Sequence, residues 1–150
     1  RTPFGIDFGI GDIIVPSAIR RKLPTQLSEF DSPVVNTYSL ETTIAEKIDA
    51  ILDLMEYSSR MKDYYDIYYL SKHFEFDSEI LSEAMRKTFA NRNHSFSKEQ
   101  FDQVMQFGTN PEMKKKWHFF ARKININDVD FEEVMREIKE FLEESFIKSC

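Results

Sequence analysis

The chain has 150 residues, 41% of them hydrophobic, a formal net charge of −6 at pH 7 and a single cysteine, Cys150. This composition suits one globular domain with its own core, and it excludes an internal disulfide, a cysteine-based metal site and a membrane-spanning segment. Because non-specific nucleic-acid binding needs clustered Lys and Arg, the acidic balance also argues against a protein that coats DNA or RNA, and we expect a cytoplasmic protein.

Residues 1–38 predict two or three short strands. A period of two, typical of a strand, places Asp7 on the face opposite a row of apolar residues, which are Phe4, Ile6, Phe8 and Ile10. Residues 13–15 continue this strand or form a second one. Residues 17–32 predict a loop with at most one short helix, and residues 33–38 predict a strand.

The chain lacks an initial methionine and enters strand-like residues directly after Arg1-Thr2-Pro3. We therefore expect a fragment of a longer protein. Residues 1–38 would be part of a sheet region and residues 39–150 a helical region, together forming one compact unit.

Ser39 predicts the N-cap of a first helix, followed by an apolar arc at helical spacing that consists of Leu40, Ile44, Ile48, Ile51, Leu52 and Met55. Lys47 falls inside this arc. Glu46, Asp49 and Asp53 fall on the opposite side, where we expect water to hydrate them.

A second helix, with Ser58 or Ser59 as its predicted cap, places Asp63 on the same face as Ile67 and Leu70. Arg60 lies one turn earlier and Asp66 flanks that face. A bare charge on an apolar face costs several kcal/mol unless it is paired or hydrogen-bonded. Lys47 and Asp63 should therefore either form a buried bridge between the two helices or face a common polar cleft.

The remaining sequence predicts further helices, about six in all, and hence an α+β fold that is predominantly helical. One is capped by Asp77 or Ser78, one begins at a capping box of Ser97 and Gln100 and ends at Gly108, one begins at Asn110-Pro111, and the last carries an apolar face from Phe131 to Leu142. The aromatic and methionine stripes of these helices indicate packing rather than a cofactor site.

Two compact basic runs, Arg20-Arg21-Lys22 and Lys114-Lys115-Lys116, could each hold an RNA backbone or could simply be solvated surfaces. The three histidines, His73, His94 and His118, lack the paired spacing of zinc ligands. Nothing resembles a serine or cysteine nucleophile motif.

Three segments resemble, in order and spacing, successive motifs of the AbiEii/AbiGii toxin family of nucleotidyltransferases; they are Tyr38-Ser39-x-Glu41, Ala45-Glu46-Lys47, and Ser59-Arg60-x-Lys62-Asp63-x-x-Asp66 with Leu70. Upstream, the segment from Gly5 to Pro16 is similar to the family's hydrophobic-Asp-hydrophobic strand. Downstream, its C-terminal helical half is matched by Thr88-Phe89-x-x-Arg92, Lys116-Trp117-x-x-Phe120 and Asp130–Val134.

The resemblance implies a nucleoside triphosphate, Mg²⁺, an acceptor that we expect to be RNA, and a cognate antitoxin. It also implies roles for particular residues: Asp7 as a metal-binding acid, Lys47 as the phosphate-binding lysine, and Asp63 as the catalytic aspartate. Arg60 and Asp66 are candidates for nucleotide binding, and Glu41 is a candidate supporting residue. The family's Gly-Ser turn with an Asp-x-Asp pair is missing from these residues, so we expect the main metal site to precede Arg1 and the fragment alone to be inactive.

Several of these residues also have purely structural interpretations. Asp7 could be a hydrated strand-end carboxylate, Glu41 and Asp66 could stabilise helix starts, and Arg60 could hold Asp63 at the i, i+3 spacing. The rival functions are a helical interaction module with a structural Lys47–Asp63 bridge and a kinase-type phosphoryl transferase. The first choice remains a nucleotidyltransferase toxin of a toxin–antitoxin or phage-defence system.

Overall fold

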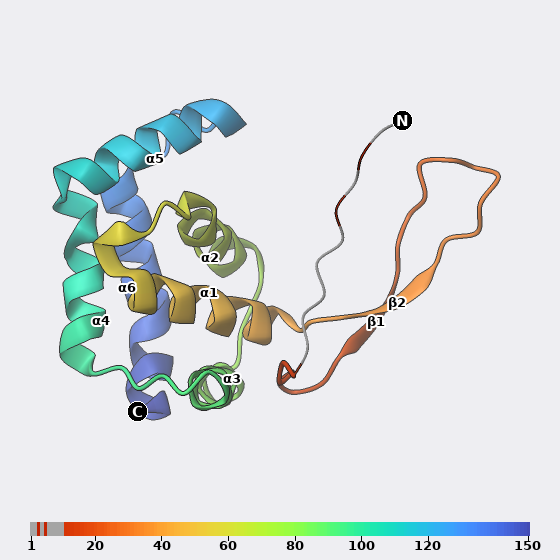
Figure 1. The fold of residues 1–150 in the computed structure, drawn as a ribbon, viewed down its shortest axis with the longest axis horizontal. Coiled ribbons are helices and arrows are strands. Elements are labelled where there is room, and N and C mark those ends of the chain that lie inside the picture. The colour runs from red at the N-terminus through yellow and green to blue at the C-terminus, as the bar shows by residue number, and fades with distance from the viewer. Residues whose placement is uncertain (1–2, 4, 6–10) are drawn as a thin grey trace.

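A computed structural model describes residues 3, 5 and 11–150 (Figure 1). Two strands, β1 (Ile19–Lys22) and β2 (Val34–Thr37), precede helix α1 (Leu40–Leu54) and the short 3₁₀ helix η1 (Met55–Tyr57). The chain continues through five more helices and a second 3₁₀ helix, which are α2 (Met61–His73), α3 (Ser78–Asn91), α4 (Lys98–Met105), η2 (Gln106–Thr109), α5 (Pro111–Ile124) and α6 (Phe131–Ser149). The predominantly helical α+β class predicted from the sequence is confirmed.

The two strands form an antiparallel hairpin that extends away from the helices (Figure 1). Its register pairs Ile19 with Thr37 and Lys22 with Val34. The predicted strand at residues 33–38 is confirmed. The loop predicted for residues 17–32 is wrong in part, because β1 lies within it. All four residues of β1 are exposed, so this strand lacks the alternation of apolar and polar residues that marks a half-buried strand in a sequence.

The strand predicted at residues 4–10 lies outside the described residues. Residues 13–15 form no strand, contrary to expectation. Val15 is instead buried and fixed to the start of α1, where its N–H donates to Thr42 Oγ1 at 2.8 Å and its carbonyl accepts from Ser39 Oγ. These side-chain partners replace the partners that a neighbouring strand would supply.

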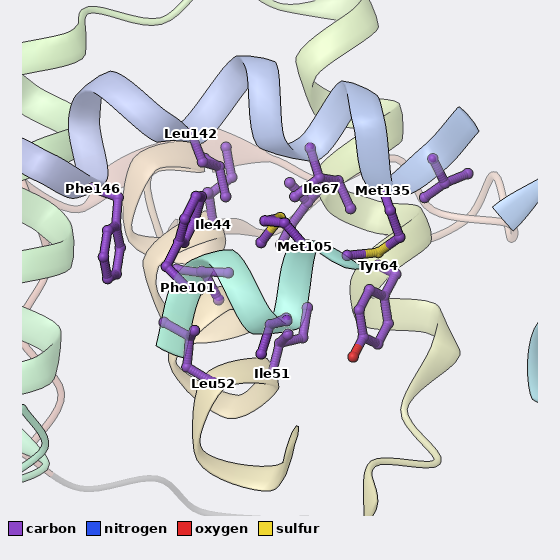
Figure 2. Close-up of a cluster of buried hydrophobic side chains, with 14 of the residues drawn as sticks. Ile44, Ile51, Leu52, Tyr64, Ile67, Phe101, Met105, Met135, Leu142 and Phe146 are labelled. Atoms are coloured by element: carbon purple, nitrogen blue, oxygen red, sulfur yellow. The ribbon is translucent and has the colours of Figure 1, made fainter. Parts of the chain in front are cut away.

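Helices α1 and α6 are the two elements around which the others pack. Helix α1 contacts α2, α3 and α4, and α6 contacts α2, α3, α4, α5 and η2. Figure 2 shows the core between them, which contains Ile44, Ile51 and Leu52 of α1, Tyr64 and Ile67 of α2, Phe101 and Met105 of α4, and Met135, Leu142 and Phe146 of α6. The stripes predicted for these helices are therefore packing surfaces.

The predicted helix starts are largely correct. Ser39, Asp77, Ser97 and Asn110 cap α1, α3, α4 and α5, and Gln100 completes the capping box. The cap of α2 is different, because neither Ser58 nor Ser59 occupies that position. Its N-cap is Arg60, and Ser58 Oγ accepts from the Arg60 N–H at 3.1 Å before the helix begins.

Gly108 does not end α4, which stops at Met105, but lies in the following turn η2. A Cβ at this position would lie 3.0 Å from Glu132 Cα and 3.2 Å from Met135 Cβ. Glycine is therefore needed here because η2 packs closely against α6, not because a helix must terminate.

Candidate functional site

Ser39 and Thr42 fix the beginning of α1 to the preceding chain. Ser39 Oγ accepts from the Thr42 N–H at 3.1 Å, as an N-cap does, and donates to the Val15 carbonyl. Both hydroxyl side chains are fully buried. This arrangement holds Tyr38, at the end of the hairpin, next to the first turns of α1.

Lys47 of α1 lies against two carboxylates of α2. Its Nζ is 2.9 Å from Asp63 Oδ1 and 2.7 Å from Asp66 Oδ2. Two further cations complete the cluster, because Arg60 Nε lies 2.7 Å from Asp63 Oδ2 and Lys62 Nζ lies 2.5 Å from Asp66 Oδ2. The exposed fractions are 5% for Asp63, 17% for Lys47 and 21% for Asp66, so these three side chains are mostly shielded from water, whereas Arg60 and Lys62 are exposed.

Asp63 keeps one oxygen that is not hydrogen-bonded. Its Oδ2 is buried and accepts no hydrogen bond, since Arg60 approaches within ion-pair distance without hydrogen-bond alignment. A buried acceptor without a donor is costly in a folded protein. This oxygen therefore has a charged neighbour, Arg60, but no aligned hydrogen-bond donor.

Lys47 and Asp63 also line one cleft of about 180 Å³, which we call the Lys47 cleft; its other polar lining residues are Tyr38, Thr43, Glu46, Arg60 and Arg92. The two alternatives predicted from the sequence, a bridge or a shared cleft, thus occur together. The lysine and aspartate contact each other and border the same cavity.

The charge of Lys47 is secure at neutral pH. Burial alone would lower the pKa of Lys47, but its hydrogen bonds to Asp66 and Asp63 outweigh burial and raise the pKa above its ordinary value. Glu46 behaves differently, because burial raises the pKa of this carboxyl despite the nearby Arg92. A hydrogen bond to Asp12, followed by burial, raises the pKa of Tyr38 to about 12, so its hydroxyl stays protonated.

Asp49 was predicted to face solvent, and this prediction is wrong. It is 1% exposed and accepts hydrogen bonds from Arg92 Nη1 at 2.8 Å, with His94 Nδ1 also at 2.8 Å. Helix α3 and the turn after it cover this side of α1, so the side opposite the apolar arc is also packed. Arg92 also approaches Glu46, with its Nη2 3.6 Å from Glu46 Oε1.

The structure brings together four of the residues singled out in the sequence, namely Lys47, Asp63, Arg60 and Asp66. Glu41 is half-buried in the first turn of α1 and is not among the residues that line the Lys47 cleft. Asp7 lies outside the described residues, so its expected role stays a prediction.

Sequence reasoning missed Thr43 and Ala50 among the residues that line the Lys47 cleft. It also missed three ionisable lining residues, Tyr38, Glu46 and Arg92. Each of these three belongs to a segment that resembles a family motif, which was the available signal. Their convergence depends on how α3 and the chain just before α1 are held against α1, and residue spacing within one helix cannot predict that.

Among residues 3, 5 and 11–150 there is no group of three or more His, Cys, Asp or Glu side chains that could hold a metal ion. The two aspartates of the cluster are already neutralised by Lys47, Arg60 and Lys62. The described residues therefore do not fit a Mg²⁺ site by themselves. In the same part of the chain, no helix is both long and apolar enough to cross a bilayer.

Comparison with known proteins supports the motif resemblance. No match was found among curated proteins or solved structures. The family model described as nucleotidyl transferase AbiEii toxin, type IV TA system, matches residues 1–143. A match over nearly the whole chain shows that this protein belongs to the AbiEii family of nucleotidyltransferase toxins, whose toxin–antitoxin systems imply an antitoxin partner.

Proposed function

We propose that the chain supplies the phosphate-binding lysine and the acceptor-orienting aspartate of a nucleotidyltransferase that transfers a nucleotide from a nucleoside triphosphate to RNA. The observation that carries this proposal is the Lys47 cleft, where an ammonium that is charged at neutral pH borders the same cavity as the buried carboxylate of Asp63. The proposal includes a cytoplasmic location, a role in phage defence, and a cognate antitoxin.

The cleft is the right size for phosphate groups rather than for a whole nucleotide. Its volume of about 180 Å³ lies below the 300–1,000 Å³ usual for pockets that enclose drug-sized ligands. Its lining combines three cations, Lys47, Arg60 and Arg92, with two carboxylates, Glu46 and Asp63, so the cations outnumber the acids. We expect the triphosphate to enter this cleft and the nucleoside to remain outside it.

In the proposed reaction, an RNA hydroxyl donates a hydrogen bond to the Asp63 carboxylate and attacks the α-phosphorus in line with the leaving group. The new bond joins the hydroxyl oxygen to the α-phosphorus, and the bond from the α-phosphorus to the bridging oxygen breaks. Pyrophosphate leaves, and Asp63 receives or directs the proton. Lys47 and Arg60 stabilise the negative charge that develops on the phosphates.

Mg²⁺ and its ligand Asp7 remain part of the proposal for the full-length protein. The metal would neutralise phosphate charge when bound. No step above depends on it, because the described residues do not form its site.

Transfer by the full-length protein tests the proposal. RNA incubated with α-labelled triphosphate should acquire label, and RNA incubated with the γ-labelled compound should not. Label from the γ position would instead establish the kinase-type rival. Transfer that survives Lys47→Met and Asp63→Asn unchanged would refute the roles assigned to these two residues.

A further inference from the structure

A second and larger cleft adjoins the Lys47 cleft. It has a volume of about 600 Å³, lies between the beginning of α2 and the outer part of α5, and shares Arg60 with the Lys47 cleft. We call it the α5 cleft and define it by Arg60, Lys62, Lys116, Phe119, Phe120 and Lys123. Arg60 also lies 2.7 Å from Asp63, so the residue that borders both clefts is next to the candidate catalytic group.

The α5 cleft is positively charged although the protein is acidic. Four of its lining residues are Lys or Arg and none is Asp or Glu. Helix α5 carries five Lys or Arg residues and one acid, Glu112, in a chain with a net charge of −6. A basic surface on an acidic protein predicts an anionic ligand at that surface.

The four cations are not equivalent. Arg60 and Lys62 are paired with Asp63 and Asp66. Lys116 donates to the carbonyls of Glu56 at 2.7 Å and Ser58 at 2.9 Å, which ties α5 to the turn before α2. Within the described part of the chain Lys123 forms no ion pair, so it is the cation available for a ligand.

An exposed aromatic ring lies beside this cation. Phe119 is 61% exposed on α5, one turn before Lys123. The adjacent Phe120 is half-buried and held by Trp117, with ring centroids 5.4 Å apart, and by Tyr65, with centroids 6.0 Å apart. A fixed apolar floor, a free ring and a free cation are the elements with which proteins bind unpaired nucleotides, the base stacking on the ring and the phosphate meeting the cation.

We infer that the α5 cleft binds the single-stranded end of the RNA acceptor, with a base stacked on Phe119 and a phosphate at Lys123, and directs the terminal hydroxyl past Arg60 to Asp63. The direction toward Asp63 rests on the proposed function, whereas the binding of unpaired RNA does not. A duplex would fit this cleft poorly, because its bases are already stacked and cannot reach Phe119.

Fluorescence anisotropy with a fluorescein-labelled 12-nucleotide single-stranded RNA tests the inference on the full-length protein without any triphosphate. Phe119→Ala should weaken binding about tenfold or more through loss of stacking. Lys123→Gln should weaken binding and reduce the slope of log affinity against log salt by about 0.7 to 1. Both side chains are on the surface, so these variants should keep the wild-type melting temperature.

The matched controls are Phe74→Ala, which removes another exposed ring, and Lys87→Gln, which removes the same charge from α3. Both should bind the RNA as the wild type does. The inference is overturned if the RNA does not bind, if the Phe119 and Lys123 variants equal their controls, if a blunt duplex binds equally well, or if a glutamate decamer displaces the RNA at equal concentration.

This experiment separates the inference from the proposed function. Lys47→Met should abolish transfer and leave RNA affinity unchanged. A protein that binds the RNA through Phe119 but never transfers a nucleotide would refute the proposed function alone. If the wild-type protein transfers nucleotides, but the Phe119 and Lys123 variants bind the RNA as tightly as the wild type, the inference alone is refuted.

Discussion

Each charge of the Lys47–Asp63 pair has a second partner. Lys47 also contacts Asp66, and Asp63 also contacts Arg60. Removing one partner from a buried ion pair is most damaging when the other charge is left alone, and here it is not. The pair is therefore more redundant than a simple bridge would be.

This redundancy predicts the outcome of a double-mutant cycle. Lys47→Met and Asp63→Asn should each lower the free energy of unfolding by about 1 kcal/mol, well below the 3–5 kcal/mol of a stranded buried charge. Each should nevertheless abolish nucleotide transfer. Urea unfolding and the labelled-triphosphate assay measure the two effects.

Lys72→Met is the control for this cycle, because it breaks the exposed pair of Lys72 with Glu137 at the other end of α2. It should keep transfer. If each single variant lowers the free energy of unfolding by several kcal/mol and the double variant lowers it little further, the result supports a structural bridge in an inactive interaction module.

Glu46 predicts a pH effect with a defined sign. Burial raises its pKa in the folded state, so the folded protein holds a proton that the unfolded chain releases. Stability must then fall as the pH rises from about 4.5 through the folded-state pKa. Glu46→Gln removes this loss, and we expect its melting temperature to exceed that of the wild type at pH 7.5 by more than at pH 4.

Glu83→Gln provides a control of opposite sign. A hydrogen bond from Lys87 lowers the pKa of Glu83, so its contribution is present above pH 4.5 and is lost as the pH falls through the folded-state pKa. This variant should be slightly less stable than the wild type at pH 7.5. Equal pH profiles for the two variants would contradict both assignments.

At the scale of elements, α1 and α3 are joined by the buried carboxylate of Asp49. Asp49→Asn keeps the shape of the side chain but removes the nearest anion from Arg92 and His94, which keep only the more distant Glu46 at 3.6 Å and Asp53 at 3.8 Å. We expect the free energy of unfolding to fall by about 2–3 kcal/mol, since the partners are partly exposed and water compensates for part of the loss.

Asp53→Asn tests whether this effect is specific. Asp53 is 53% exposed and lies 3.8 Å from His94. Its substitution should change the free energy of unfolding by less than about 0.5 kcal/mol. Equal losses for the two variants would show that Asp49 is not the link between the helices.

Four helix starts followed from the sequence because their signals are local, whereas the cap predicted for α2 and the end predicted for α4 were wrong. Ser39, Asp77, the Ser97 box and Asn110-Pro111 mark their helices because a cap needs only the residues next to it. The proximity of Lys47 and Asp63 was also predictable, since both interrupt apolar faces of neighbouring helices. The burial of Asp49 was not predictable. Helical periodicity shows which face of α1 carries Asp49, but it does not show that α3 covers that face.

At the scale of the whole molecule, the hairpin and the helices are separate packing units. Among the main contacts between elements, β1 contacts only β2, and the hairpin projects from the bundle (Figure 1). Several apolar side chains are exposed along it, including Leu27, Phe30 and Val34. Stability should therefore depend on the helices and very little on the hairpin.

Replacing residues 24–32 by Gly-Ser-Gly tests this separation. Shortening an exposed loop changes closure entropy by less than about 1 kcal/mol. We expect the helical circular dichroism and the melting temperature to match those of the wild type, with Leu142→Ala as the core control that lowers stability by about 2–5 kcal/mol. A collapse of helical signal in the loop variant would show that the hairpin supports the bundle.

Trp117 is the only tryptophan among these 150 residues. It is buried with its ring centroid 5.4 Å from that of Phe120, and its indole N–H donates to the Val129 carbonyl at 2.8 Å. A molecule bound in the α5 cleft contacts the Phe120 ring and so changes the environment of this indole. The emission spectrum of the untagged protein consequently offers a label-free optical readout of occupancy on α5, independent of any chemical turnover.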